Sequence, residues 1–430
     1  MFGISISPMR APYGLLYAQL PFHGWLIVAV TFLASALSIG PGYAFGLFID
    51  PLQDSFGWQR TAVSASLSFA AVGSLTSPLL GKFMDRFGAR PLMAVSLTIM
   101  GTSFLLRPLM TELWHWYALS FLQYLAFSGS AGLPAGRLVG IWFAKSRGRV
   151  MGITTMGNNF GGFIVPLITG FLLASGNWEA AFLILAGLTY FVALLSILVI
   201  RERPDRRPGP DGQWAVGAIP PELEGWTLRE ALHSRSFYTI GVALSLGAFT
   251  YSAVLPQISD HLISQGMSRT TVPFAISLLA AFGMMGKLSF GYLSERFTAR
   301  RMLMVSLSGQ IVFIAMIVRF PTEPMAWLVA PAFGLFMGAF GALVPLLVQE
   351  TFGLRNFGTI AGLISTASVI PFFSGPLLAG SSFDIADSYG PGFLIVAVMF
   401  ALAVATLSQG GAVPGASLGR DSIASDDGRA

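Results

Sequence analysis

The feature that most constrains this chain is a series of twelve stretches of about 20 mostly apolar residues each. An α-helix of that length crosses the hydrocarbon core of a bilayer. Only 10% of the 430 residues are charged, far below the roughly 25% of soluble proteins. We therefore predict an all-α membrane protein with twelve transmembrane helices. The expected spans are 23–49, 61–83, 91–110, 114–143, 150–175, 179–200, 236–262, 271–293, 302–320, 326–349, 357–380 and 390–410.

The distribution of Lys and Arg predicts the orientation of these helices. Nineteen of the 25 basic residues fall in alternate connections if the N-terminus lies in the cytoplasm. Because cytoplasmic loops carry an excess of Lys and Arg, we expect both termini inside. No signal-peptide cleavage site follows the first 22 residues, so the first helix would be the insertion signal. We expect a multi-pass protein of the inner cell membrane.

The two halves of the sequence repeat each other at an ungapped offset of 210 residues. GKFMDRFGAR from Gly81 aligns with GYLSERFTAR from Gly291, and the same offset pairs Gly152 with Gly362. Two six-helix repeats with a substrate site between them are a known plan of transporters. The expected parts are a cytoplasmic segment 1–22, a first half 23–200, a cytoplasmic linker 201–235, a second half 236–410 and a disordered cytoplasmic tail 411–430.

The composition argues against other classes of protein. The chain has no Cys, and its four His residues have no metal-ligand spacing. No nucleophile–His–acid set or phosphate-binding loop is recognisable, so an enzyme is not expected. The net charge of +5 follows from the membrane topology and needs no nucleic acid. We expect no cofactor and no metal, a small-molecule substrate and the lipid bilayer as partners, and a monomer.

The loop Gly81–Arg90 resembles the signature loop between helices 2 and 3 of the major facilitator superfamily, and Gly291–Arg301 is a weaker second copy. The resemblance covers residues 23–410 and implies a twelve-helix transporter in which these loops latch the two halves in one state. The Gly would allow close helix packing, and the acid could meet a helix N-terminus or an Arg. The predicted latch residues are Gly81, Asp85, Arg86, Arg90, Gly291, Glu295, Arg296 and Arg300.

Within that superfamily the chain is similar to the monocarboxylate-transporter group, which includes oxalate/formate antiporters. The similar pieces are Gly24-Trp25, Tyr43-Ala-Phe-Gly46, Trp142 to Gly148 and Lys287-Leu-Ser-Phe-Gly291. The animal carriers have a proton-linked Lys where this chain has Leu47. The oxalate carrier has a basic residue in helix 11, whereas residues 357–380 have none. The resemblance therefore favours a small organic monoanion over a dicarboxylate.

Lys287 is the first candidate for substrate binding, because an ionisable side chain inside a membrane helix is costly and usually functional. In the resembling family the helix 8 cation meets the substrate carboxylate. Arg137 is a second buried cation, and snorkelling to the surface is the structural alternative for both. Further candidates at suitable depth are Tyr43, Asn158 and Tyr251. Gly40-Pro41-Gly42 is expected to break helix 1 beside Tyr43.

Proton coupling requires a titratable group, and no Asp or Glu lies in the middle of a predicted helix. Asp260, at the outer end of helix 7, and its neighbour His261 are the candidates. A solvated helix-end acid is the structural alternative for Asp260. The leading hypothesis is thus a proton-linked carrier of a small organic monoanion. The alternatives are a carrier of a neutral or aromatic nutrient such as a vitamin and, outside transport, a nutrient sensor.

Overall fold

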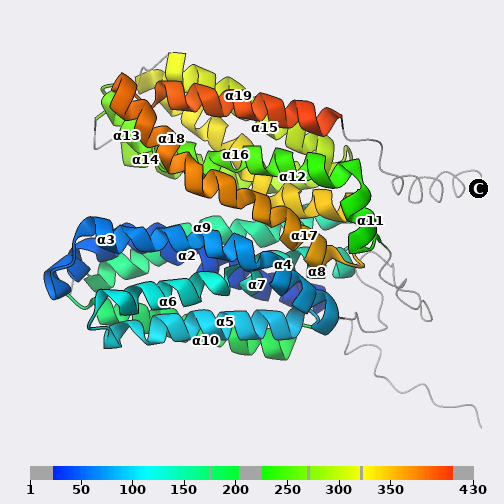
Figure 1. Ribbon diagram of the computed structural model, residues 1–430, viewed down its shortest axis with the longest axis horizontal. Coiled ribbons are helices and arrows are strands. Elements are labelled where there is room, and N and C mark those ends of the chain that lie inside the picture. The colour runs from blue at the N-terminus through cyan, green and yellow to red at the C-terminus, as the bar shows by residue number, and fades with distance from the viewer. Residues whose placement is uncertain are drawn as a thin grey trace, which may run out of the picture.

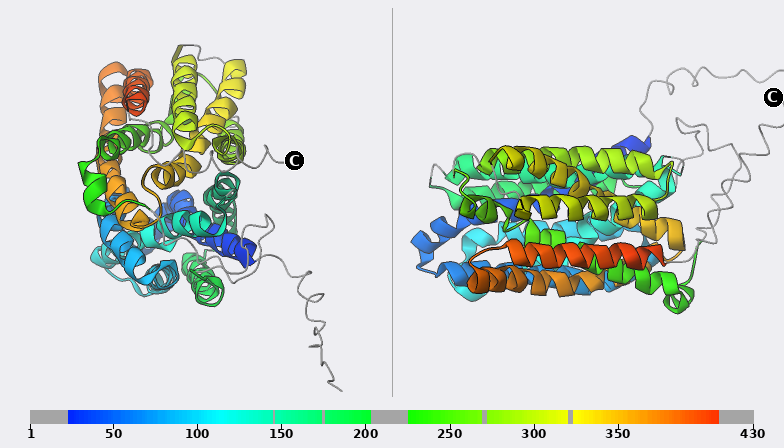
Figure 2. Two further views of the ribbon diagram at one scale, coloured as in Figure 1. Left: turned by 90° about the vertical axis from the view of Figure 1, so that its right-hand side faces the viewer. Right: turned by 90° about the horizontal axis from the view of Figure 1, so that it is seen from above.

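The computed structural model describes residues 23–144, 146–173, 176–202, 225–268, 272–319 and 323–409. The predicted N-terminal segment and the predicted tail lie outside these residues, as does most of the predicted linker. The described chain is a bundle of helices that run along one common direction (Figure 1). Viewed along that direction, the helices are seen nearly end-on (Figure 2).

The first half contains six helical passes, three of them divided into shorter segments. Its elements are α2 (His23–Phe56), α3 (Arg60–Ala65), η1 (Ser66–Phe69), α4 (Ala70–Phe87), α5 (Ala89–Leu105), η2 (Arg107–Leu109), α6 (Leu113–Leu125), α7 (Phe127–Ser130), α8 (Gly132–Trp142), α9 (Arg147–Leu173) and α10 (Trp178–Val199).

The second half repeats this order after a short helix. Its elements are α11 (Leu228–His233), α12 (Arg235–Gly247), the π-helical η3 (Thr250–Val254), α13 (Ile258–Ser264), α14 (Val272–Ser294), α15 (Ala299–Arg319), α16 (Glu323–Phe352), α17 (Phe357–Ser365), η4 (Thr366–Ser368), α18 (Val369–Ala386) and α19 (Gly390–Ser408). Within the described residues, 11 helices are long and apolar enough to cross a membrane. The twelfth pass is the divided series α6, α7 and α8.

One local prediction about a helix break needs correction. The sequence Gly40-Pro41-Gly42 does not break helix 1, because α2 is one continuous helix with both Pro41 and Pro51 inside it. Helix 4 breaks instead, at Ala126 and at Ala131, whose backbone angles of φ −146° and ψ −50° are not helical. Neither break contains a proline, so neither carried a strong sequence signal.

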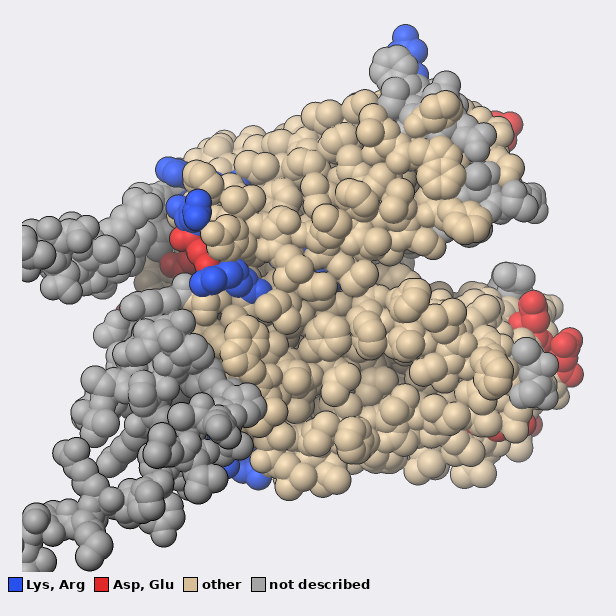
Figure 3. All heavy atoms as spheres, turned by 180° about the vertical axis from the view of Figure 1, so that it is seen from behind, with Lys and Arg blue, Asp and Glu red and all other residues tan. Residues whose placement is uncertain are grey.

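The two halves lie side by side and meet at one end of the bundle. We call this the basic end, because it carries the exposed side chains of Arg86, Arg90 and Arg296. In Figure 3 blue Lys and Arg side chains gather there, while a groove separates the halves at the opposite end. The contacts between α4 and α17 and between α9 and α14 join the halves. The structure is therefore closed at the basic end and open at the other.

The closed end is built from four glycines that the internal repeat relates. Gly81 on α4 packs against Gly358 on α17, and Gly291 on α14 packs against Gly148 on α9. The two pairs are equivalent at the offset of 210 residues, which relates Gly81 to Gly291 and Gly148 to Gly358. A Cβ atom on any of the four would collide with the backbone across the crossing. Only glycine permits so close an approach of two helices.

One turn further from the basic end, a second repeat-related pair of contacts follows. Gly362 packs against the backbone of Ser77, and Gly152 packs against the backbone of Lys287. Ser77 and Lys287 occupy equivalent positions in the two halves. Lys287 therefore lies at the crossing of α14 with α9, where the halves touch.

Candidate functional site

A cavity of ≈ 300 Å³ lies between the halves. Both halves contribute to its wall, which is mainly apolar. Its polar lining comes from short neutral side chains such as Ser35, Ser38, Thr155 and Asn158. None of the lining residues is charged. The aromatic and aliphatic part of the wall includes Phe127, Leu133, Phe340, Val344 and Phe357.

The side chain of Lys287 lies directly behind the wall of this cavity, outside its lining, and crosses from one half to the other. It is 4% exposed. Its Nζ donates to the backbone oxygen of Thr155 at 2.8 Å and to Oδ1 of Asn159 at 2.5 Å, both on α9. Thr155 lines the cavity, and Gly341, another lining residue, lies beside Cε of Lys287. Two lining residues thus contact the Lys287 side chain, which places the ammonium group behind the wall beside Thr155.

Lys287 has no carboxylate partner in the described part of the chain, because both of its hydrogen bonds go to neutral oxygens. A buried ammonium ion loses several kcal/mol of hydration, which neutral oxygens offset only in part. The snorkelling alternative does not describe this side chain, since its Nζ is held between the halves. The geometry leaves Lys287 able to receive an anion.

Two adjacent asparagines on α9 have different contacts, one with the cavity and one with α14. Asn158, a predicted substrate residue, lines the cavity. Asn159 accepts from Lys287, and its Nδ2 donates to the backbone oxygen of Ala280 on α14 at 3.1 Å. Asn159 therefore ties α9 to α14 and orients the ammonium group.

The two predicted tyrosines lie outside the lining of the cavity. Tyr251 stands behind Phe340, with the ring centroids 6.0 Å apart, and its hydroxyl donates to the backbone oxygen of Met337. Tyr43 is 53% exposed, and its ring packs beside Gly162.

Arg137 requires a correction, because its contacts differ from those of a substrate-binding residue. Its Nη1 pairs with Asp85 and its Nε pairs with Glu202, both at 3.1 Å. Glu202 also accepts from the backbone N–H of Ala89 at the start of α5. Asp85 belongs to the first half and Glu202 follows its last helix, so Arg137 has both carboxylate partners on its own side of the interface. We withdraw Arg137 as a candidate for substrate binding.

The predicted proton-coupling pair also lies away from the cavity. Asp260 is exposed on α13. His261 is 1% exposed and packs edge-on against Phe393, with the ring centroids 5.1 Å apart. Among the described residues, the structure brings neither side chain into contact with Lys287. The solvated alternative describes Asp260.

At the basic end, Asp85 caps the N-terminus of a helix in the other half. Its carboxylate accepts from the backbone N–H groups of Gly358 and Thr359 at 2.9 and 2.7 Å, and from the Thr359 hydroxyl at 2.7 Å. The first N–H groups of α17 have no partner within the helix and carry its positive dipole end. Arg137 contacts the same carboxylate, so Asp85 joins three segments.

Glu295 makes the repeat-related contact on the other side of the bundle. Its Oε1 accepts from the backbone N–H of Arg149 at 2.8 Å, near the start of α9. Its Oε2 pairs with the Arg149 side chain, which is 54% exposed. At the offset of 210 residues, Asp85 is equivalent to Glu295, and Arg149 is equivalent to Thr359. Both acids therefore bind a helix start in the opposite half.

The basic residues of the two loops make fewer contacts between the halves. Arg86 stacks on Phe87 of its own helix, and Arg296 donates to the hydroxyl of Tyr292. Arg90 is exposed. Arg300 lies near Glu350, whose carboxylate accepts from the backbone N–H of Ala299. These side chains place positive charge at the basic end, and these contacts each lie within one half.

Sequence reasoning missed several residues that the structure assigns to these contacts. Glu202 lies in the predicted linker, and no local pattern indicated that it folds back onto Arg137. Gly358 and Thr359 could have been found, because the repeat offset leads to them from Gly148 and Arg149. The role of Thr155 is carried by its backbone oxygen, which no sequence pattern reveals.

Comparison with known proteins identifies the family. A sequence model described as Major Facilitator Superfamily matches residues 31–376. The chain belongs to this superfamily. The match spans well over half of the chain and includes segments from both halves. The predicted resemblance is therefore confirmed, together with the twelve-helix, two-half fold.

Named relatives support the same placement. Monocarboxylate transporter 12 of Rattus norvegicus is 24% identical over 406 residues, which cover 86% of this chain and 82% of the relative. Monocarboxylate transporter 13 of Bos taurus is 25% identical over 393 residues, covering 88% and 87%. The solved fucose:proton symporter FucP of E. coli has the same fold, with a TM-score of 0.69 at 13% identity over 90% of this chain and 98% of that one.

This major facilitator is a transporter and not an enzyme, as predicted. It is a multi-pass membrane protein that binds a small molecule within the membrane. The similarity to monocarboxylate transporters is confirmed at the level of the group.

Proposed function

We propose that this transporter moves a small organic monoanion across the inner membrane by alternating access, together with a proton. The observation that carries the proposal is the position of Lys287. Its ammonium group is bound by neutral oxygens directly behind the wall of the cavity between the halves, where it contacts the lining residue Thr155. A carboxylate in the cavity would supply the charge partner that the ammonium group lacks.

The cavity supports a substrate with one carboxylate and a compact apolar body. Its volume of ≈ 300 Å³ is at the lower end of small-molecule sites. The wall supplies aromatic and aliphatic contacts and a few hydroxyl and amide groups. A second carboxylate would face these neutral surfaces without a cation. A monocarboxylate therefore fits better than a dicarboxylate.

The closed basic end supports alternating access. We propose that this end faces the cytoplasm, as the excess of basic residues there favours. The present structure would then be open to the outside. Opening toward the cytoplasm requires that Asp85 leave α17 and that Glu295 leave α9. These repeat-related contacts, with the four packed glycines, would form the latch.

Substrate binding would weaken this closure at Lys287. The ammonium group now bonds Thr155 and Asn159 across the interface between the halves. An ammonium group has three donors and two of them are used here, so a carboxylate can bind the third and, being charged, competes with the two neutral oxygens for the position of Nζ. The competition loosens α14 from α9, so that binding favours the opposite state.

Proton linkage follows from the balance of charge. An anion and a proton that bind together cancel each other's charge, so the site can cross the low-dielectric interior without net charge. Lys287 is the ionisable side chain closest to the proposed carboxylate. We propose that it carries this proton, in place of Asp260 and His261, which lie away from the cavity.

The neutral lining of the cavity favours a second candidate function, transport of a neutral or aromatic nutrient. Three phenylalanines, Phe127, Phe340 and Phe357, line the cavity and could stack on such a compound. In that case Lys287 would be a structural tie between the halves and would not contact the substrate.

The test is uptake by proteoliposomes that contain the purified protein. The panel holds labelled lactate, pyruvate, formate, oxalate and one neutral vitamin, each with and without an inward proton gradient. The proposal expects uptake of a monocarboxylate, accelerated by the gradient. Uptake of the vitamin alone would support the second candidate, and a rate indifferent to the gradient would contradict proton linkage.

A further inference from the structure

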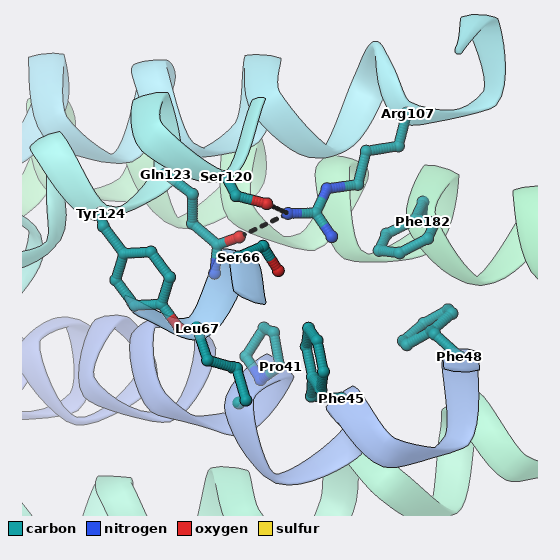
Figure 4. A pocket seen from close by; sticks show the side chains of 11 residues that line it. Pro41, Phe45, Phe48, Ser66, Leu67, Arg107, Ser120, Gln123, Tyr124 and Phe182 are labelled. Atoms are coloured by element: carbon teal, nitrogen blue, oxygen red, sulfur yellow. Dashed lines mark hydrogen bonds between the residues drawn. The ribbon is translucent and has the colours of Figure 1, made fainter. Parts of the chain in front are cut away.

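A second, much smaller cavity lies inside the first half, among α2, η1, α6 and α10. Its volume is ≈ 20 Å³, enough for one water-sized occupant. Polar side chains on one side of it are Ser66, Arg107, Ser120 and Gln123, and Phe45 and Phe48 lie on the other (Figure 4). Leu67, another lining residue, is 41% exposed, so part of the lining lies at the surface of the half.

Arg107 is the charged group of this cavity, and it is 5% exposed. Its Nη2 donates to Oε1 of Gln123 at 2.8 Å and to Oγ of Ser120 at 3.4 Å. Its Nε is buried without a hydrogen-bond partner. The guanidinium also lies over aromatic rings, 4.2 Å from the centroid of Trp116 and 4.8 Å from that of Phe182. All of these partners are neutral.

Arg137 shows what an equally buried arginine of this protein requires. It is 6% exposed and pairs with two carboxylates, Asp85 and Glu202. Arg107 pairs with none in the described part of the chain. A buried guanidinium cannot shed its proton, so its charge persists and needs an anion or strong dipoles nearby. The cavity beside Arg107 is where such an anion would fit.

We propose that this cavity binds one monovalent anion of halide size. Arg107 supplies the charge and the unpaired Nε–H donor, the Ser120 hydroxyl and the Gln123 amide supply further donors, and the rings of Phe45 and Phe48 close the site. The volume of ≈ 20 Å³ is about one fifteenth of that of the cavity between the halves, so the site suits an ion rather than the body of an organic substrate. The site is separate from Lys287 and does not depend on the proposed substrate.

The anion would stabilise the outer part of the first half. Arg107 follows α5, Ser120 and Gln123 lie on α6, and Phe182 lies on α10. An anion bound to Arg107 completes a contact among these helices without touching the interface between the halves. A halide should therefore raise thermal stability without a requirement for substrate.

Thermal unfolding of the purified full-length protein in detergent tests the site. Sodium bromide replaces sodium gluconate at constant ionic strength, and unfolding is followed by light scattering. We expect a saturable rise of about 2–4 °C in wild type and none in Arg107→Gln, which keeps size and polarity but loses the charge. No saturable rise in wild type, or an equal rise in the variant, would overturn the proposal.

Iodide quenching of tryptophan fluorescence tests the same site by location. Trp116 is fully buried and its ring centroid lies 4.2 Å from Arg107, so iodide bound beside Arg107 would lie next to this ring. We expect a saturable component of quenching in wild type and in Trp114→Phe, which removes an exposed tryptophan, and loss of that component in Trp116→Phe. Persistence of the component in Trp116→Phe would contradict the location.

Two further measurements cover the cases in which Arg107→Gln does not fold and in which the site binds carboxylates. If Arg107→Gln does not fold, Arg107→Lys takes its place in the test. This variant keeps the charge but has no Nε–H in the same position. The bromide concentration at its half-maximal stabilisation should therefore be at least about tenfold higher than in wild type, which corresponds to about 1.4 kcal/mol. An unchanged midpoint in Arg107→Lys would contradict the proposed geometry. If lactate raises stability as much as bromide and with the same dependence on Arg107, the site takes carboxylates and the halide assignment is wrong.

Discussion

The ammonium group of Lys287 lies 2.8 Å from the backbone oxygen of Thr155, on a helix of the opposite half. This one contact joins the cavity to the interface between the halves. It explains how a single residue could both bind a substrate anion and report its presence to the rest of the protein. The following predictions test the separate parts of this account.

Asn159 should matter more than its neighbour Asn158 for the tie between the halves. Asn159→Leu removes a hydrogen bond to a charged group and one to Ala280, each worth about 1–3 kcal/mol. We expect weaker closure of the basic end and a transport rate about tenfold lower. Asn158→Leu, the matched control, should change substrate affinity more than closure. Closure of the basic end can be measured by the labelling of a cysteine introduced there. Equal labelling in the two variants would contradict a greater role of Asn159 in closure.

The glycine crossings should control the conformational state. In Gly148→Leu the new side chain collides with the backbone of Gly291, so the closed basic end loses stability. Because the chain has no native Cys, a single cysteine in place of Met84, which is fully buried at the basic end, reports whether this end is open. We expect its labelling by an impermeant maleimide to rise at least about fivefold, as for a population shift of about 1 kcal/mol. Gly170→Leu, at a position with open space, is the control and should leave labelling unchanged.

The two acidic latches should differ in strength. Asp85 is 12% exposed, accepts three hydrogen bonds from α17 and pairs with Arg137. Glu295 pairs with a half-exposed Arg149, and exposed ion pairs contribute about 0–1 kcal/mol. We expect Asp85→Asn to lower the transport rate about tenfold and Glu295→Gln about twofold, measured in proteoliposomes. A larger effect of Glu295→Gln would show that hydrogen bonding to α17 does not dominate the latch.

A strained residue in the second half offers a stability test. Gly88 and Thr298 occupy equivalent turns and have φ angles of +95° and +98°. Glycine adopts this conformation without strain, whereas a β-branched residue loses about 1–3 kcal/mol. Thr298→Gly should therefore raise the melting temperature by about 2–4 °C, measured by thermal unfolding in detergent. Gly88→Thr should lower it, and a lower melting temperature in Thr298→Gly would refute the strain.

Much of the fold was predictable because the bilayer imposes a simple rule on sequence. Every pass must be apolar for about 20 residues, and basic residues gather on one side. The offset of 210 residues also carried information about contacts, since it relates Gly81 to Gly291 and Asp85 to Glu295. The helix breaks were less predictable: Gly40-Pro41-Gly42 stays helical, while helix 4 breaks at two alanines.

The candidate site was predictable only in part, for a physical reason. Periodicity and hydropathy locate a charge such as Lys287 or Arg137 at membrane depth, but they do not show what it meets. Arg137 pairs with Glu202, which lies beyond the last helix of the first half. No local sequence pattern indicates this contact. Lys287 meets a backbone oxygen and an amide, so its charge stays available. The difference lies in tertiary packing.

The most direct test of the central claim is the uptake of labelled monocarboxylate by proteoliposomes with wild type, Lys287→Gln and Lys287→Arg. Removal of a charged partner from a buried carboxylate site typically costs about 2–5 kcal/mol. We predict that Lys287→Gln inserts and folds but loses at least about 30-fold in uptake, while Lys287→Arg retains part of it. Wild-type uptake in Lys287→Gln would contradict the account, because Lys287 would then be only a structural tie between α14 and α9.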